Sequence, residues 1–180
     1  MTGAQANTSA MLRTVEAWAH ASMGRSQSTR RTLGEAEELF AQDSGAPGPS
    51  WLQFFDQADL HGMEALTYRT LAEHDPSAAP LAQLHAQQAI DLRGDGYDRS
   101  KLFDYLSMAS ASYLAGQPDR ADTFARMALS STREMSSHRT WDRLREMYRL
   151  SESYEHLSDV QVLRADIRQA LPRPVTPPPM

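Results

Sequence analysis

Apolar residues recur at spacings of three and four along most of the chain, and no stretch alternates between apolar and polar residues as a strand would. The two clearest stretches carry these apolar or small positions: Leu12, Val15, Trp18, Ala19 and Ser22; and Leu102, Leu106, Ala109 and Tyr113. Glycine and proline clusters near positions 24, 44–49, 75–76, 94–96 and 116–118 divide the pattern into helices of roughly 12 to 17 residues. The sequence therefore predicts an all-α protein.

Two segments repeat one spacing of small residues. The first has Ala17, Gly24, Thr29, Leu33 and Ala36, and the second has Ala109, Gly116, Ala121, Ala125 and Ala128. In each segment the first small residue allows two helices to approach closely. The glycine then ends the first helix, because it can adopt a positive φ. The later small residues allow the second helix to pack against the first. The late part of this spacing recurs at Ala82, Ala86 and Ala89. We expect three helical hairpins, at about 10–42, 51–93 and 99–135, with a capping helix pair at 137–170.

This arrangement of a small residue, a turn glycine and a second helix with spaced small residues resembles the tetratricopeptide repeat. The resemblance implies a right-handed superhelix whose first helices line a concave groove. It also implies one solenoid domain over residues 10–171. Residues 1–9 and the proline-rich tail 172–180 are expected to be disordered, because neither shows a helical pattern.

A narrower resemblance runs from Leu12 to Leu171. Its residues are Pro49-Ser50-Trp51, the run from Phe54 to Leu60, Tyr68-Arg69, the run from Ala89 to Arg93, the run from Leu114 to Gln117, Ser137-His138-Arg139 and Leu144. Together they are similar to the repeat region of actinobacterial helix-turn-helix transcriptional regulators. In such regulators the repeats follow a DNA-binding domain and act in sensing or dimerisation. Because eleven residues precede Leu12, we expect this chain to carry the repeat region without that domain.

The expected register places a set of side chains in the groove. They are Met11, Thr14 and Trp18 from the first hairpin, Tyr68 from the second, and Phe103, Leu106, Ser110 and Tyr113 from the third. Such a groove is apolar and aromatic, which favours a non-catalytic module that binds a protein or peptide and serves regulation. Some of these residues, Trp18 and Leu106 among them, have core packing between hairpins as an alternative.

Two other functions stay open. One is a small-molecule or enzymatic role in a helical cavity lined by Trp18, Tyr68 and Tyr113, and the other is a scaffold or homodimer whose groove holds a second chain. A closed polar pocket with clustered histidine and acid would favour the former.

Composition and charge exclude several classes of function. The absence of cysteine removes disulfides and thiolate metal sites, and the net charge of -5 argues against direct nucleic-acid binding. No apolar run is long enough for a membrane helix and no secretion signal opens the chain, so we expect a cytoplasmic protein. Residues 35–75 are acidic and residues 120–149 are mildly basic. With one lysine and one asparagine, the chain lacks the side chains of a carboxylate clamp.

Candidate catalytic and metal-binding residues are not indicated. No two of the six histidines have the helical spacing of three or four that places two ligands on one face. Glu64 follows His61 by three residues, but such pairs are ordinary on exposed helix faces. The sequence has no phosphate-binding loop, nucleophile elbow or paired carboxylates in an apolar setting. We therefore expect no enzyme activity, no cofactor and no metal.

Overall fold

The computed structural model describes residues 3–42, 55–132 and 137–172, and these residues are helical without any strand. The α-helices are α1 (Gly3–Ser22), α2 (Ser26–Ala41), α3 (Gln57–Ala72), α4 (Ala79–Leu92), α5 (Asp98–Leu114), α6 (Pro118–Thr132), α7 (His138–Leu150) and α8 (Ser158–Ala170). Two short 3-10 helices, η2 (Pro76–Ala78) and η3 (Ser151–Tyr154), precede α4 and follow α7. The predicted all-α class is confirmed.

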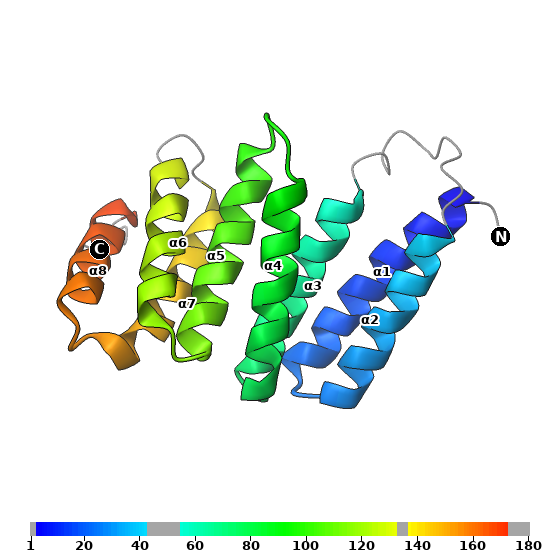
Figure 1. Ribbon diagram of the computed structural model, residues 1–180, viewed down its shortest axis with the longest axis horizontal. Coiled ribbons are helices and arrows are strands. Elements are labelled where there is room, and N and C mark those ends of the chain that lie inside the picture. The colour runs from blue at the N-terminus through cyan, green and yellow to red at the C-terminus, as the bar shows by residue number, and fades with distance from the viewer. Residues whose placement is uncertain (1–2, 43–54, 133–136, 173–180) are drawn as a thin grey trace, which may run out of the picture.

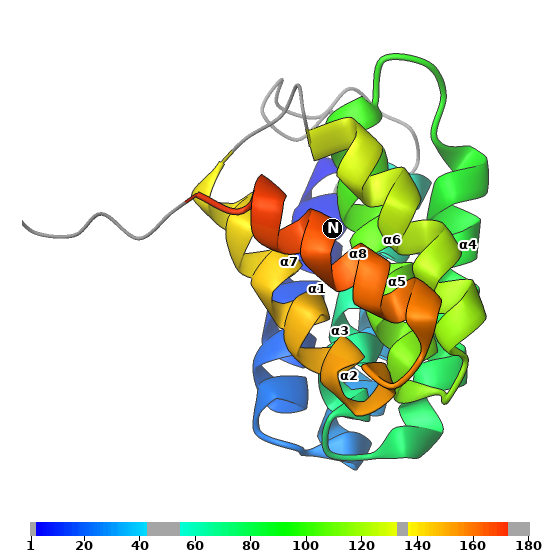
Figure 2. The same ribbon diagram turned by 90° about the vertical axis from the view of Figure 1, so that its left-hand side faces the viewer.

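The helices form a row of hairpins along the long axis of the molecule (Figure 1). Each of α1, α3 and α5 packs against the helix that follows it, and α1 also packs on α3, α3 on α5, and α5 on α7. At the C-terminal end α8 lies across the row against α6 and α7 (Figure 2). The odd-numbered helices from α1 to α7 are thus neighbours in space.

The repeated small residues lie where the helices touch. Ala17, Ala36 and Ala109 are fully buried, as are the two later triplets, Ala82, Ala86 and Ala89, and Ala121, Ala125 and Ala128. Gly24 and Gly116 have φ of +68° and +75° and end α1 and α5. These observations confirm that the spacing marks helix contacts and turns.

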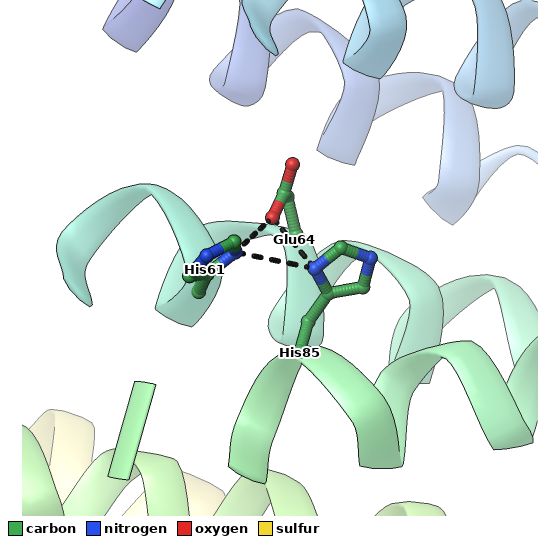
Figure 3. Close-up of side chains that lie close together, drawn as sticks. All are labelled: His61, Glu64 and His85. Carbon is green, nitrogen blue, oxygen red and sulfur yellow. Dashed lines mark hydrogen bonds and ion pairs between the residues drawn. The ribbon is translucent and has the colours of Figure 1, made fainter. Parts of the chain in front are cut away.

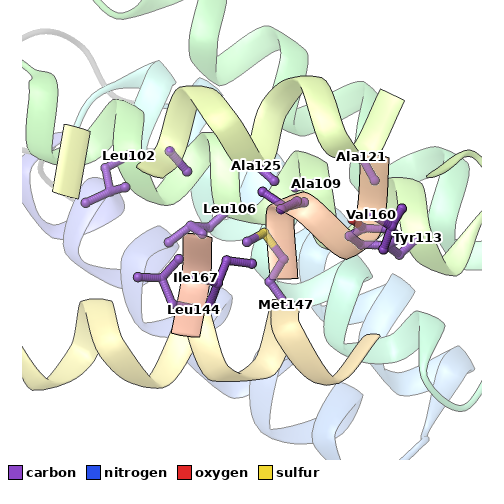
Figure 4. Close-up of a cluster of buried hydrophobic side chains, with 12 residues drawn as sticks. Leu102, Leu106, Ala109, Tyr113, Ala121, Ala125, Leu144, Met147, Val160 and Ile167 are labelled. Carbon is purple, nitrogen blue, oxygen red and sulfur yellow. The ribbon is translucent and has the colours of Figure 1, made fainter. Parts of the chain in front are cut away.

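The core at the C-terminal end joins α5, α6, α7 and α8 (Figure 4). Leu144 and Met147 of α7 and Leu163 of α8 are fully buried in it, against Leu102 and Leu106 of α5. The strongly amphipathic α7 turns its arginine and glutamate side chains away from this core. The last two helices therefore cover the apolar face that the third hairpin would otherwise expose.

The N-terminal end differs from expectation. Residues 3–9 are helical in α1, so the predicted disorder of residues 1–9 is wrong there. Ala6 and Ala10 are buried, and the Asn7 side-chain amide donates a hydrogen bond of 3.2 Å to the carbonyl of Phe55. That partner lies 48 positions away, so the sequence pattern near residue 7 does not reveal it.

Parts of three expected features lie outside the described residues. They are the proline-rich tail from residue 173, the start of the second hairpin at 51–54 and the end of the third at 133–136. Among the helices of the described ranges, none combines the length and apolarity that a membrane crossing requires.

Candidate functional site

The odd-numbered helices line a groove of about 400 Å³ on one side of the row. Its apolar lining includes Met11, Val15, Met63, Leu66, Phe103 and Leu106. Its charged lining includes Asp59, Arg69, Arg93, Arg99, Asp104, Arg139, Arg143 and Glu146. The volume falls within the range of ligand pockets, and the lining combines an apolar surface with many more charges than we expected.

One buried ion-pair cluster forms the α3–α5 part of the groove. Arg93, directly after α4, has Nη1 at 2.8 Å from Oδ1 of Asp59 and Nε at 3.2 Å from Oδ2 of Asp104. Burial raises the pKa of Asp104 to about 6, although Arg93 acts in the opposite direction. Gly62 permits the close packing, since a Cβ there would lie 3.1 Å from Oδ1 of Asp104.

A second ion-pair cluster joins α3 to α7. Nη1 of the buried Arg69 lies 2.6 Å from Oε1 of Glu146, whose other oxygen accepts a hydrogen bond of 2.9 Å from Arg143. Arg149 of α7 also reaches Glu73, at 2.6 Å. Ion pairs of both senses therefore join the acidic segment 35–75 to the basic segment 120–149 across this contact.

Three guanidinium groups gather where α5 and α7 meet the groove. Arg139 lies over the ring of Phe103 at 4.7 Å from its centroid. Loss of hydration at that position, together with repulsion from Arg143 and Arg99, lowers the pKa of Arg139. Within the described residues, no carboxylate forms an ion pair with Arg99 or Arg139. This end of the groove therefore carries positive charge that an anion would stabilise.

Five of the eight predicted groove residues line it: Met11, Thr14, Phe103, Leu106 and Ser110. Trp18 is 38% exposed on α1 but lies outside the lining. Tyr68 is buried and stacks on His85. Tyr113 is buried in the C-terminal core, where its ring stacks on Tyr154 at 5.6 Å.

Sequence reasoning missed the arginines of the groove. The composition excludes a carboxylate clamp built from lysine and asparagine, but the lining offers arginine, which binds carboxylates with two parallel hydrogen bonds. The lining keeps expected apolar side chains such as Met11 and Phe103, and it adds arginines and acids that the expectation lacked. Arg139 and Arg143 lie four residues apart on α7, and this spacing was the available signal.

Away from the groove, two histidines and a glutamate converge between α3 and α4 (Figure 3). Oε2 of Glu64 lies 2.8 Å from Nδ1 of His61 and 2.7 Å from Nδ1 of His85, and the two nitrogen atoms are 3.4 Å apart. Glu64 is fully buried, contrary to the exposed helix face expected for it. Burial acts to raise the pKa of Glu64, but the hydrogen bonds and charge interactions with His85 and His61 hold it below its usual value. Among the described residues, His61, Glu64 and His85 form the group whose potential metal-ligand atoms lie close enough together to hold one ion.

Comparison of the chain with known proteins gives no relative. No family model matches it, and neither the curated proteins nor the solved structures contain a match.

Proposed function

We propose that the chain is a non-catalytic binding module that holds an acidic segment of a protein or peptide in the groove of α1, α3, α5 and α7. The observation that carries this proposal is the set of Arg99, Arg139 and Arg143, of which two lack an acidic partner among the described residues. A carboxylate placed between these groups relieves their mutual repulsion and gains charge-assisted hydrogen bonds. The ligand supplies the missing negative charge.

The apolar part of the groove sets a second requirement, which is that the ligand also carries apolar side chains. Met11, Val15 and Phe103 offer partly exposed apolar surface beside the arginines. An extended segment with aliphatic and acidic side chains matches both surfaces at once. In this proposal the row is a right-handed superhelix of the tetratricopeptide type, and the chain serves regulation, as in the repeat region of helix-turn-helix regulators.

Peptide selection tests the proposal. A library of random peptides displayed on phage is selected on the immobilised chain, and the bound pool is sequenced. We expect enrichment of aspartate and glutamate together with aliphatic residues, and micromolar binding by the best peptides.

The matched variants are the double substitutions R99Q/R139Q in the groove and R25Q/R168Q on exposed positions outside it. The first should reduce the affinity of the selected peptides by about tenfold or more, because charge-assisted contacts are lost. The second removes the same net charge and should leave affinity unchanged. Enrichment of neutral or basic sequences, or equal binding to both variants, would overturn the proposal.

A further inference from the structure

We propose that His61, Glu64 and His85 bind a divalent transition-metal ion of the zinc class in the interior of the α3–α4 hairpin. The ligand atoms are Nδ1 of each histidine and Oε2 of Glu64, and solvent completes the coordination of the ion. None of these residues lines the groove, so this site is independent of the proposed peptide binding.

The positions of the three atoms fit a metal ion without rearrangement of the helices. With separations of 2.7, 2.8 and 3.4 Å, they lie on a circle of radius about 1.8 Å. Zinc binds imidazole nitrogen and carboxylate oxygen at about 2.0 to 2.2 Å. A point at that distance from all three atoms lies about 1 Å to one side of their plane. The N–N separation already equals the edge of a tetrahedral site, and the two N–O separations reach it when side-chain rotation opens them by about 0.6 Å.

The chemistry of the donors also favours a cation. Imidazole nitrogen and carboxylate oxygen are ligands for zinc and its neighbours in the first transition row. Without an ion, both Nδ1 atoms donate to the same oxygen of Glu64, and their two N–H groups then face each other across 3.4 Å. When an ion is bound, each of these three atoms instead coordinates it through a lone pair, and the repulsion between the two N–H groups is removed.

Glu64 supplies an independent observation. Its side chain is fully buried, and its second oxygen, Oε1, has no hydrogen-bond partner among the described donors. A buried carboxylate with one unpaired oxygen is costly without a positive charge beside it, and a bound cation supplies that charge.

The surroundings hold the ligands in place. His61 and Glu64 are one turn apart on α3, and the ring of His85 stacks on Tyr68 with centroids 5.4 Å apart and planes at 18°. His61 and His85 keep side-chain exposures of 15% and 13%, so an ion can enter from solvent. Bound there, the ion joins α3 to α4.

Zinc and cobalt titrations of the full chain test this site. The chain is prepared without a histidine tag and treated with a chelator, and Zn²⁺ is then titrated against a chromophoric competitor. We expect one Zn²⁺ per chain, and Co²⁺ should give the intense visible absorption of four-coordinate cobalt. Absence of stoichiometric zinc binding in the unmodified chain would overturn the proposal.

Matched histidine variants assign the ligands. H85Q should weaken zinc binding by at least about 100-fold, since even outer-shell substitutions cost 10- to 100-fold. H156Q removes an exposed histidine outside the cluster and should bind zinc as the unmodified chain does. Equal zinc affinity in H85Q and the unmodified chain would refute the assignment.

A readout on the unmodified chain removes any dependence on the folding of H85Q. X-ray absorption at the zinc edge should show two imidazole ligands, with nitrogen and oxygen neighbours at about 2.0 to 2.2 Å. Zinc should also raise the melting temperature of the unmodified chain, because it binds the folded state. A zinc spectrum without imidazole scattering would overturn the proposal.

Discussion

Tyr113 gives a direct test of the packing of the C-terminal core. Its side chain is 3% exposed, its ring stacks on Tyr154, and its backbone carbonyl accepts a hydrogen bond of 2.9 Å from the Tyr154 hydroxyl. Replacing a buried aromatic residue by alanine costs about 3 to 5 kcal/mol through lost burial and the remaining cavity. Since a domain has about 5 to 15 kcal/mol of stability, Y113A should lose a large fraction of it in urea denaturation followed by far-ultraviolet circular dichroism.

Two controls separate ring packing from other effects. Trp18 is 38% exposed, so W18A should cost less than about 1 kcal/mol. Y113F keeps the ring and removes a buried hydroxyl that has no hydrogen-bond partner among the described residues, so its cost should also be below about 1 kcal/mol. If Y113A were as stable as W18A, the placement of Tyr113 in the core would be refuted.

Further predictions concern a buried acid and two glycines. Because the pKa of Asp104 is raised to about 6, the folded state binds its proton more tightly than the unfolded state does, and stability from this group falls as pH rises from about 4 to 6. D104N should lack this fall, so its stability relative to the unmodified chain should increase between pH 4 and pH 7 in urea titrations; parallel curves would contradict it. G24A should destabilise by about 1 kcal/mol or more, since φ is +68° and a Cβ would lie 3.2 Å from His74. G34A, inside α2 with open space around it, should instead stabilise by about 0.5 to 1 kcal/mol, and thermal unfolding of the pair should show opposite signs.

The hairpins could be predicted from the sequence because their determinants are local. The step from Ala109 to Gly116 spans two turns of helix, and both residues act on the helix that contains them or on the next one. The start of α1 could not be predicted this way. Its support comes from Phe55 through the amide of Asn7, and a contact across 48 positions leaves no periodic signal.

The position of the groove and part of its apolar lining could be predicted from the sequence, but its charged residues could not. Helical register correctly brought Met11, Phe103 and Leu106 to one surface, because register follows from the period of the helix. Arg93 reaches the groove from the end of α4, and His85 reaches Glu64 from another helix, so both depend on tertiary packing. Spacing along one helix relates His61 to Glu64 but contains no signal for His85, so the sequence did not indicate a metal site here.

Glu146 connects the stability of the row to the charge of its groove. It holds the buried Arg69 and also accepts from Arg143, and although burial acts in the opposite sense, Arg69 and Arg143 lower the pKa of Glu146. E146Q leaves Arg69 with Glu73 at 3.5 Å as its acidic partner, which should cost about 2 to 4 kcal/mol in urea denaturation. The same change frees positive charge in the groove, so acidic peptides from the selection should bind E146Q several-fold more tightly. E38Q, which removes an exposed acid of α2 outside the groove, should change neither property appreciably. Opposite shifts of stability and affinity are the signature of a groove whose own carboxylate competes with the ligand, whereas a loss of both would show that Glu146 only maintains the fold.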